Sequence, residues 1–486
     1  MHDTLTFGLV VLCTAGAGLL AVQSHVVSER IRIPAPALFL LAAACAVQVV
    51  PGLEPRARTV ERVVTVALLV ILFEGGMGIG AARMRSALSA VLGLGVLGTF
   101  ATVVGAAVLL HAVLGVSWYL SVLVATAVAP TDPAVVFSVL GQREVEGRSG
   151  TILEGESGAN DPVGIALMAA LLSAGSLSGG ALWQVAGTFA VQMVVGAVVG
   201  VAGGRLLLLV MRRVPVPGEG LHPVRTLVGA GLLFGVATVA HGSGFLAVFL
   251  AGVVIGDERA PFKREIERFH AALASLAEIV AFAYLGFTVD LDVLVRPDVW
   301  VPGVVVGILL ALLVRPVVAL PVLLPIRLGW GERAFVLFAG LKGAVPLLLG
   351  SLLLPLPGGD RLYGVVVVVV LVSVVLQGSL VPTVARLLRV GMRSVEPQPF
   401  ASGMRLPTEP ACERRLRVET GSAADGRKID ELPGLAEGTW VSMVRRGDAL
   451  VPVRGRTRLL AGDEVLLLVD PEQDARDVAA LFAGSA

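Results

Sequence analysis

The chain has 486 residues, of which 56% are hydrophobic and only 15% are charged, and its mean hydropathy is +0.86. Soluble domains usually carry about 25% charged residues, so this composition excludes an ordinary soluble protein and predicts many membrane spans. The net charge of +1 gives no sign of a nucleic-acid partner, and the three cysteines form no CxxC pair that would predict a disulfide framework or a metal site.

Apolar windows of roughly 20 residues predict about thirteen transmembrane helices. The first window, residues 5–22, lacks a basic leader and a cleavage motif, so we expect a retained helix rather than a signal peptide. The expected centres, in chain order, are Cys13, Ala42, Leu69, Thr102, Ala127, Leu167, Val195, Leu233, Phe249, Ala281, Leu309, Leu347 and Val374. Thirteen spans place the two ends of the chain on opposite sides of the membrane.

Basic residues in the loops predict the orientation. With the N-terminus outside, the inward loops hold 18 Lys and Arg residues and the outward loops hold 5. Cytoplasmic loops carry the excess of Lys and Arg in membrane proteins. The asymmetry therefore predicts a multi-pass protein of the cell inner (plasma) membrane, with the N-terminus outside and the C-terminus in the cytoplasm.

The composition changes after Arg393. Residues 1–393 are expected to form the transmembrane domain, residues 394–412 a linker rich in Pro, Ser and Glu, and residues 413–486 a small cytoplasmic α+β domain. Short strands are predicted near residues 414–419, 440–444 and 464–469. The expected fold class is an all-α polytopic membrane protein with a small cytoplasmic α+β domain.

The fifth span is interrupted by the motif Ala129-Pro130-Thr131-Asp132-Pro133. Two prolines remove backbone donors and block a regular helix, which frees carbonyl groups and the Thr131 hydroxyl to face an ion. Such an interruption is tolerated in a membrane only where it lines a protein or water cavity. We expect an ion site here; the alternative is a proline kink at which Asp132 caps a helix.

The sixth span begins with Glu156-Ser157, followed by Asn160-Asp161. Residues four apart lie on one side of a helix, so Ser157, Asn160 and Asp161 can face one site together. Their hydroxyl, amide and carboxylate oxygens suit a hard monovalent cation, with water completing its shell. A helix N-terminus enriched in acids is the alternative, and it accounts poorly for Asp161.

Two basic side chains are also embedded in apolar sequence, Arg315 and Lys342. We expect each to neutralise a buried acid in a structural ion pair, with Glu156 as the favoured partner of Lys342. Glu278 and Glu74 are further acids in or near spans, and the sequence leaves their roles open.

The segment from Gly93 to Gly98 matches the dinucleotide pattern G-x-G-x-x-G, but it lies in an apolar span with no strand before it. Close helix packing through small residues explains it better. We therefore expect no nucleotide and no other cofactor beyond a transported cation and protons.

Taken together, these motifs resemble the monovalent cation:proton antiporter family, in particular its NhaP-like branch. The resemblance covers about residues 5–390 and rests on Thr131-Asp132-Pro133, on Glu156-Ser157 with Asn160-Asp161, and on Gly340-Leu341-Lys342-Gly343-Ala344-Val345-Pro346. It implies two inverted repeats with crossing interrupted helices, assembled as a homodimer.

The resemblance also implies the roles of the site residues. Asp161 would be the carboxylate shared by cation and proton, supported by Asp132 and Asn160, with Thr131 and Ser157 as further ligands. Members with Asn-Asp at this position are generally taken as electroneutral. One departure concerns Lys342, because the family usually has Arg there, and Lys lacks the planar fork of a guanidinium.

The tail resembles the C-terminal half of the RCK/TrkA regulatory module, through Leu432-Pro433, the segment 441–447 and Leu459-Leu460-Ala461-Gly462-Asp463-Glu464. That module is associated with potassium-linked transporters and implies a small ligand for the tail.

The sequence thus predicts a transporter rather than an enzyme, a secondary antiporter that exchanges K⁺ or Na⁺, with K⁺ favoured slightly, for protons. Three alternatives remain open: a cation channel with an RCK-type tail, a non-transporting membrane sensor and an intramembrane aspartyl protease. A TVGYG-like filter and the protease motif G-x-G-D, which would favour the first and the last, are missing from the sequence.

Overall fold

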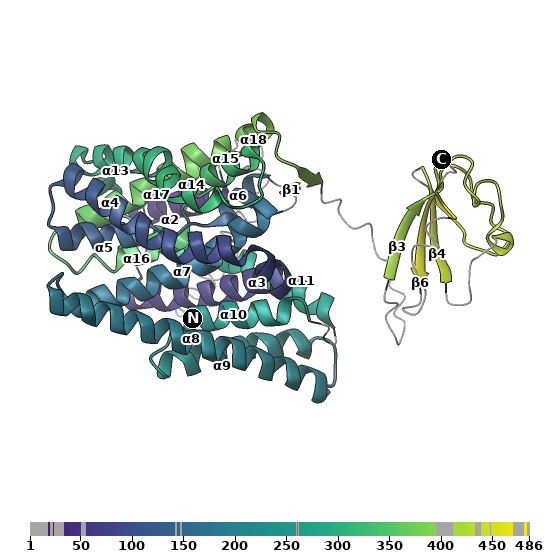
Figure 1. The fold of residues 1–486 in the computed structure, drawn as a ribbon, viewed down its shortest axis with the longest axis horizontal. Helices are drawn as coiled ribbons and strands as arrows, with labels where there is room; N and C mark the ends of the chain where they lie inside the picture. The colour runs from purple at the N-terminus through teal and green to yellow at the C-terminus, as the bar shows by residue number, and fades with distance from the viewer. Residues whose placement is uncertain are drawn as a thin grey trace, which may run out of the picture. The chain divides into compact units, whose positions relative to one another are not determined.

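A computed structural model describes residues 34–49, 55–140, 143–145, 148–258, 260, 262–394, 412–432, 439–447, 449–469 and 481–483, together with residues 18, 19 and 23. The chain divides into two compact units, Met1–Glu396 and Pro397–Ala486. The first unit is a bundle of helices, and the second contains a small sheet (Figure 1).

The first unit consists almost entirely of helices. Its first half contains α2 (Ala35–Val49), α3 (Ala57–Leu92), η1 (Gly93–Leu97), α4 (Gly98–Leu114), α5 (Trp118–Val128), α6 (Pro133–Leu140), α7 (Arg148–Ala174) and α8 (Gly179–Arg213). Its second half contains α9 (Leu221–Val239), α10 (Gly244–Gly256), α11 (Lys263–Gly286), α12 (Leu291–Leu294), α13 (Pro297–Leu309), η2 (Leu310–Val314), α14 (Arg315–Leu323), α15 (Trp330–Phe338), α16 (Ala344–Ser351), α17 (Gly359–Leu371), η3 (Val372–Gln377) and α18 (Gly378–Leu387).

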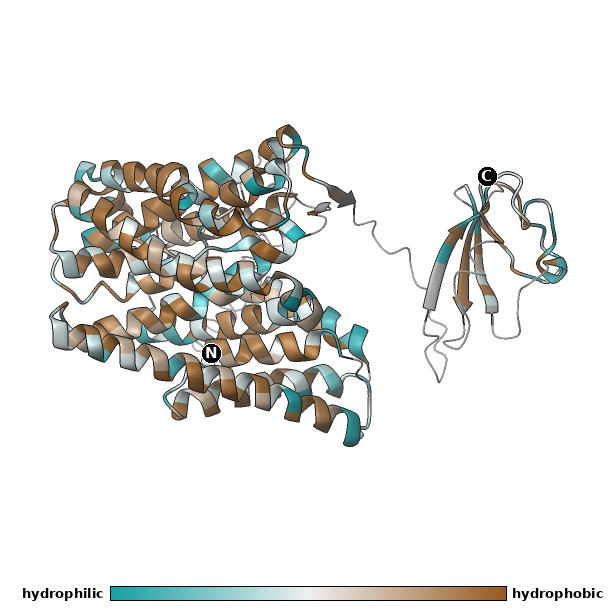
Figure 2. Cartoon of the chain, in the orientation of Figure 1, coloured by the Kyte–Doolittle hydropathy of each residue, from teal (hydrophilic) through white to brown (hydrophobic). Residues whose placement is uncertain are grey.

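Seven stretches of the described residues are long and apolar enough to cross a membrane, and two shorter apolar helices accompany them. The stretch Ala57–Leu114 has 58 residues and would be about 87 Å long if straight, far more than one bilayer crossing. Gly80, at φ 70° and ψ 166°, interrupts its helical geometry. The predicted polytopic helical fold is confirmed, and apolar residues cover its helices (Figure 2). The number thirteen stays a prediction, because most of the first span lies outside the described residues.

Glycines bring the backbones of α3 and α10 into direct contact. A Cβ atom at Gly76 would collide with the Phe249 carbonyl, and one at Gly252 would collide with the Phe73 carbonyl. On the neighbouring helix α7, Gly158 lies against the Phe249 ring of α10 with no room for a side chain. Small residues permit this close approach of helices in a membrane protein, and here they fix α7 against α10.

A two-stranded ribbon joins two distant parts of the first unit. Strand β1 (Arg143–Val145) lies between α6 and α7, and β2 (Met392–Ser394) follows α18. The two strands pair antiparallel, with Val145 opposite Met392. The backbone that leaves the membrane unit is therefore hydrogen-bonded to the connection between α6 and α7.

The second unit contains a four-stranded antiparallel sheet with strand order β3-β6-β4-β5. Its strands are β3 (Cys412–Arg417), β4 (Thr439–Arg446), β5 (Ala449–Val451) and β6 (Glu464–Val469), and three of them overlap the predicted strands. Its apolar core includes Val444, Val465 and Leu467. Of the predicted linker 394–412, Ser394 belongs to β2 and Cys412 to β3, and the rest lies outside the described residues.

Candidate functional site

The first helix interruption separates α5 from α6. Regular helix ends at Val128 and resumes at Pro133, and residues 129–132, here called the first break, are not helical. Pro130 and Pro133 cannot donate backbone hydrogen bonds, and each disfavours helical geometry at the residue before it. The predicted interruption is confirmed, and it leaves backbone carbonyls at the end of α5 without helical partners.

A second interruption separates α15 from α16. Residues 339–343, here called the second break, contain Gly340 and Gly343. Both glycines lie where a side chain would not fit: a Cβ atom at Gly340 would lie 2.7 Å from Arg315 Nε, and one at Gly343 would collide with the Asp132 carboxylate. The glycines therefore allow the second break to approach both charged groups.

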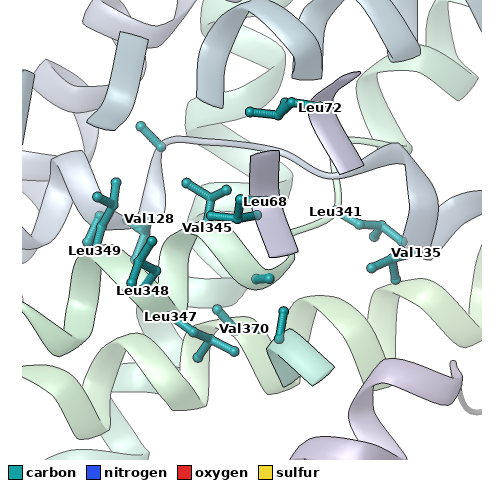
Figure 3. Close-up of a cluster of buried hydrophobic side chains, with 14 of the residues drawn as sticks. Leu68, Leu72, Val128, Val135, Leu341, Val345, Leu347, Leu348, Leu349 and Val370 are labelled. Atoms are coloured by element: carbon teal, nitrogen blue, oxygen red, sulfur yellow. The ribbon is translucent and has the colours of Figure 1, made fainter. Parts of the chain in front are cut away.

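The two breaks cross each other and are joined by two hydrogen bonds. The Asp132 backbone N–H donates to the Leu341 carbonyl at 2.8 Å, and Lys342 Nζ donates to the Ala129 carbonyl at 3.0 Å. Apolar side chains pack around the crossing, among them Val128, Val135, Leu341 and Val345 (Figure 3). Water is thereby kept away from much of the crossing, which strengthens the polar interactions inside it.

The Asp132 carboxylate lies at the N-termini of two helices. Its carboxylate accepts a hydrogen bond from the Ala134 backbone N–H at 2.8 Å and lies close to the backbone N–H groups of Val135 and Ala344. Asp132 therefore caps the N-termini of both α6 and α16, whose exposed N–H groups and dipoles favour a negative charge. The alternative of a capping role, left open by the sequence, is seen here for Asp132.

Asn160 connects α7 to the first break. Its side-chain amide donates to Thr131 Oγ1 at 2.8 Å, and its carbonyl oxygen accepts from the Thr131 backbone N–H at 3.4 Å. Asn160 is 2% exposed and Thr131 is 7% exposed. The structure thus brings these two predicted site residues into direct contact, with the amide of Asn160 used to hold the break.

Asp161 and Ser157 lie on the same buried side of α7, with exposures of 8% and 6%. Asp161 is near enough to Asp132 and Lys342 to interact with both electrostatically. Among the described residues, none donates a hydrogen bond to the Asp161 carboxylate in this structure. Asp161 therefore differs from Asp132: its oxygens remain available to another positively charged partner.

The predicted ion pair of Glu156 with Lys342 is wrong. Glu156 pairs with Arg315 instead, through Arg315 Nη1 to Glu156 Oε1 and through Nη2 to Oε2 at 2.8 Å. A guanidinium can hold both oxygens of a carboxylate at once. Lys342, which is 8% exposed, uses its ammonium group on a backbone carbonyl of the other break. The expected structural ion pair thus exists for Arg315 and not for Lys342.

Ser373 and Gln377 also belong to this region, although the sequence analysis did not identify them. Both lie in η3 and are buried. The signal available in the sequence is a pair of polar residues four apart within an otherwise apolar span. A small cavity beside the crossing is lined by these two side chains together with Thr131, Lys342 and Arg315.

Two further acids are near the crossing helices. Glu278, on α11, has one carboxylate oxygen that is buried without a hydrogen-bond partner, and it interacts electrostatically with Asp132. Glu74, on α3, is half-buried. The structure therefore places Glu278, whose role was left open, on the Asp132 side of the site.

The arrangement suits reversible binding of a small cation. Four half-helices meet at the crossing, where Asp132 lies at the positive ends of α6 and α16 and Lys342 at the negative end of α5. The buried carboxylate of Asp161 accepts no hydrogen bond from a described residue, and Ser157 lies one turn before it on α7. An ionised carboxylate at this depth is costly unless a cation or a proton neutralises it.

Comparisons with known proteins match both units. The family profile described as "Sodium/hydrogen exchanger, transmembrane" matches residues 16–387, and the profile described as "TrkA-C domain" matches residues 414–483. These matches bear out the two resemblances that the motifs indicated.

Curated relatives align over most of the chain. The K(+)/H(+) antiporter NhaP of Alkalimonas amylolytica is 31% identical over 388 residues, which cover 79% of this chain and 67% of that protein. The K(+)/H(+) antiporter NhaP2 of Shewanella oneidensis is 30% identical over 468 residues, covering 94% of this chain and 80% of that protein. The Na(+)/H(+) antiporter NhaS2 of Synechocystis is 27% identical, covering 77% and 68%.

A solved structure shares the fold. The sodium proton antiporter MjNhaP1 from Methanocaldococcus jannaschii superposes with a TM-score of 0.66 at 20% sequence identity, covering 80% of this chain and 98% of that one. At this identity the likeness establishes the architecture of the membrane unit and leaves the chemistry of the site to its own residues.

Proposed function

The chain belongs to the sodium/hydrogen exchanger family, and from this premise we propose that Asp161 is the shared carboxylate at which it exchanges a monovalent cation for protons. The protein is a secondary active antiporter of the membrane, with a TrkA-C domain at its C-terminal end. Cation and proton are its substrates, so we class it as a transporter and not as an enzyme.

The contrast between two acids carries the assignment. Asp132 is occupied by backbone N–H groups of α6 and α16. Asp161, at 8% exposure, is more deeply buried than Asp132, and no described residue donates a hydrogen bond to its carboxylate. Of the two, only Asp161 can accept and release a cation without breaking a helix cap. Thr131 and Ser157 would add oxygen ligands, and Asn160 would hold the first break in position.

Exchange follows from competition for one charge. A cation and a proton each neutralise Asp161, and either neutral form can pass through the rearrangement that exposes the site to the other side. The empty, ionised form carries an uncompensated charge in an apolar bundle and is held back by the cost of burying it. Since the exchange is coupled and uses no other energy source, the steeper of the two gradients sets the direction.

The cation and the stoichiometry are part of the proposal. We propose K⁺ as the preferred cation because two relatives at 30–31% identity are K⁺/H⁺ antiporters by name. We propose electroneutral exchange because the residue beside Asp161 is the uncharged Asn160, whose amide is engaged with Thr131. One titrating carboxylate then accounts for one cation or one proton in each cycle.

The setting of the transporter belongs to the same proposal. The loop charges favour an N-terminus outside and a C-terminus in the cytoplasm of the cell membrane. A homodimer, which the resemblance of the motifs to the antiporter family implies, is part of the proposal. We further propose that exchange requires no cofactor, and that the TrkA-C domain binds a small regulatory ligand.

The decisive experiment is proton flux in proteoliposomes, followed with a pH-sensitive dye while Na⁺, K⁺ and Li⁺ are titrated in turn. An antiporter gives a proton flux that depends on the opposing cation and saturates with its concentration. A K⁺ preference appears as the lowest KM for K⁺. Cation current without proton counterflow would indicate a channel, absence of both fluxes would indicate a sensor, and either result would refute the proposal.

A further inference from the structure

We propose that Ser373 and Gln377 form a clamp that fixes the second break against the first and thereby sets the selectivity between monovalent cations. The two side chains are positioning residues, since their hydrogen bonds go to the second break and not to the proposed ligands. The inference rests on the proposed function, because selectivity has meaning only if the chain exchanges cations.

The clamp consists of three consecutive hydrogen bonds. Ser373 Oγ accepts from the Lys342 backbone N–H at 3.0 Å and donates to Gln377 Oε1 at 3.2 Å. Gln377 Nε2 donates in turn to the Phe338 carbonyl. The clamp thus holds both edges of the second break, the last residue of α15 on one side and Lys342 on the other.

These bonds satisfy backbone groups that the break itself leaves without helical partners. The end of α15 exposes carbonyl groups, and the residues before α16 expose N–H groups. Burying such groups unpaired costs free energy, because the membrane interior holds no water to form the missing hydrogen bonds. Ser373 is 6% exposed and Gln377 is 9% exposed, so no bulk water replaces the clamp.

The first break is held by the same kind of contact. Asn160, on the helix that follows α6, reaches back to both the N–H and the hydroxyl of Thr131. Ser373 and Gln377 lie on the helical segment that follows α16 and reach back to the second break. Each broken helix is therefore held in place by polar side chains of the next long helix, and the clamp is the counterpart of Asn160.

The clamp is linked to the cation site through Lys342. The backbone of Lys342 is held by Ser373, while its ammonium group is bonded to the Ala129 carbonyl in the first break. Thr131 is two residues from Ala129, and Lys342 also acts electrostatically on Asp161. A shift of the second break therefore changes the position of the first break and of the charge that faces Asp161.

Selectivity is the property most sensitive to such a shift. Two monovalent cations carry the same charge and differ in radius, so fixed distances between ligand oxygens are what separates them. A rigid frame is required to keep those distances. Both side chains lie in the π-helical turn of η3, and such turns inside α-helices are frequent at functional sites.

The test compares the KM values for Na⁺, K⁺ and Li⁺ in proteoliposomes carrying Gln377→Met or Ser373→Ala. We expect the ratio of the highest to the lowest KM to fall about fivefold or more, while Vmax for the preferred cation changes less than about twofold. Ser373→Thr, which keeps the hydroxyl group, should retain the wild-type ratio. Gln184→Met on the exposed face of α8 and Ser379→Ala on α18 serve as matched controls and should also retain it.

Several outcomes would overturn the proposal. One is a ratio of highest to lowest KM that stays unchanged in both Gln377→Met and Ser373→Ala. Another is a ratio that falls in Ser373→Thr as much as in Ser373→Ala. The third is a wild type with equal KM values for all three cations. If Gln377→Met does not assemble, the comparison of Ser373→Ala with Ser373→Thr decides. Failure of the proposed function is distinct, since the wild type would then show no cation-dependent proton flux at all.

Discussion

Lys342 and Ala129 face each other where the two broken helices cross, with the ammonium Nζ 3.0 Å from the carbonyl oxygen. The carbonyl is free because α5 ends at Val128, and the negative end of a helix favours a cation. A lysine that stabilises a helix end has no need of a carboxylate partner. This contact leaves Glu156 to pair with Arg315.

The first prediction concerns the two aspartates. Asp161→Asn should abolish cation-dependent proton flux in proteoliposomes and leave the unfolding temperature in detergent within a few degrees of the wild type. Asp132→Asn, in contrast, should lower the unfolding temperature. An amide has only one acceptor oxygen for two helix N-termini, and each cap contributes about 1 kcal/mol. Normal flux from Asp161→Asn would refute its role as the shared carboxylate.

The second prediction concerns the buried ion pair. Glu156→Gln should destabilise the protein by about 3–5 kcal/mol, because it leaves the Arg315 guanidinium buried without its counter-charge. Lys342→Met removes one hydrogen bond to a carbonyl and should cost about 1–3 kcal/mol. Chemical unfolding in detergent measures both changes.

Asp298→Asn provides the matched control for that comparison. Asp298 pairs with Arg296 and Arg361 at half-exposed positions, and such pairs contribute about 0–1 kcal/mol. An equal loss of stability in Lys342→Met and Glu156→Gln would contradict the pairing of Glu156 with Arg315.

The third prediction concerns the close approach of the breaks. Gly343→Ala should lower the exchange rate at least about tenfold, because the added methyl group meets the Asp132 carboxylate and forces the crossing apart. Gly231→Ala on α9 meets open space and should leave the rate unchanged. Proton flux per folded protein measures both; equal rates in the two variants would show that the crossing tolerates the displacement.

The fourth prediction concerns the C-terminal unit. Burial alone would raise the pKa of Asp463, but hydrogen bonds from Arg446 and from the Leu460 N–H hold that pKa below its ordinary value. A carboxyl with a depressed pKa stabilises the fold at every pH above its unfolded value, and this stabilisation is lost as the pH falls through the folded value. Asp463→Asn should therefore destabilise the sheet by about 1–2 kcal/mol at neutral pH, a figure kept low because Arg446 is 42% exposed.

Hydrogen exchange of β4 and β6 in the full chain measures this effect. The amides of both strands should exchange faster in Asp463→Asn than in the wild type at pH 7, and the difference should shrink near pH 3. Glu464→Gln, at a more exposed pair with Arg445, is the control and should change exchange less. A difference that persists undiminished at low pH would exclude the charge of Asp463 as its cause.

The sequence predicted the first helix interruption because its cause is local. Prolines at 130 and 133 forbid a regular helix whatever surrounds them, and the residues of α7 share a face through simple spacing. These features located Thr131, Ser157, Asn160 and Asp161 within one region. The polytopic fold followed from composition, since uncharged apolar windows of this length match the thickness of a bilayer and recur along the chain.

The errors and omissions arose where partners are far apart in the chain. The partner of Lys342 could not be found from spacing, because it is a backbone carbonyl that only the crossing brings near. Ser373 and Gln377 were missed for the same reason: the backbone groups that they satisfy become unpaired only in the second break. The capping of α16 by Asp132 likewise depends on the approach permitted by Gly343.

The pairing of β1 with β2 has a mechanical consequence. Tension applied to the chain beyond Ser394 acts on the β1 backbone as well as on α18, because the two strands are hydrogen-bonded. Strand β1 lies between α6 and α7 in the chain, so the load acts between the helix that follows Asp132 and the helix that carries Asp161. A tether fastened only to the end of α18 would reach α6 only through the packing of those two helices and would not pull on the β1 backbone.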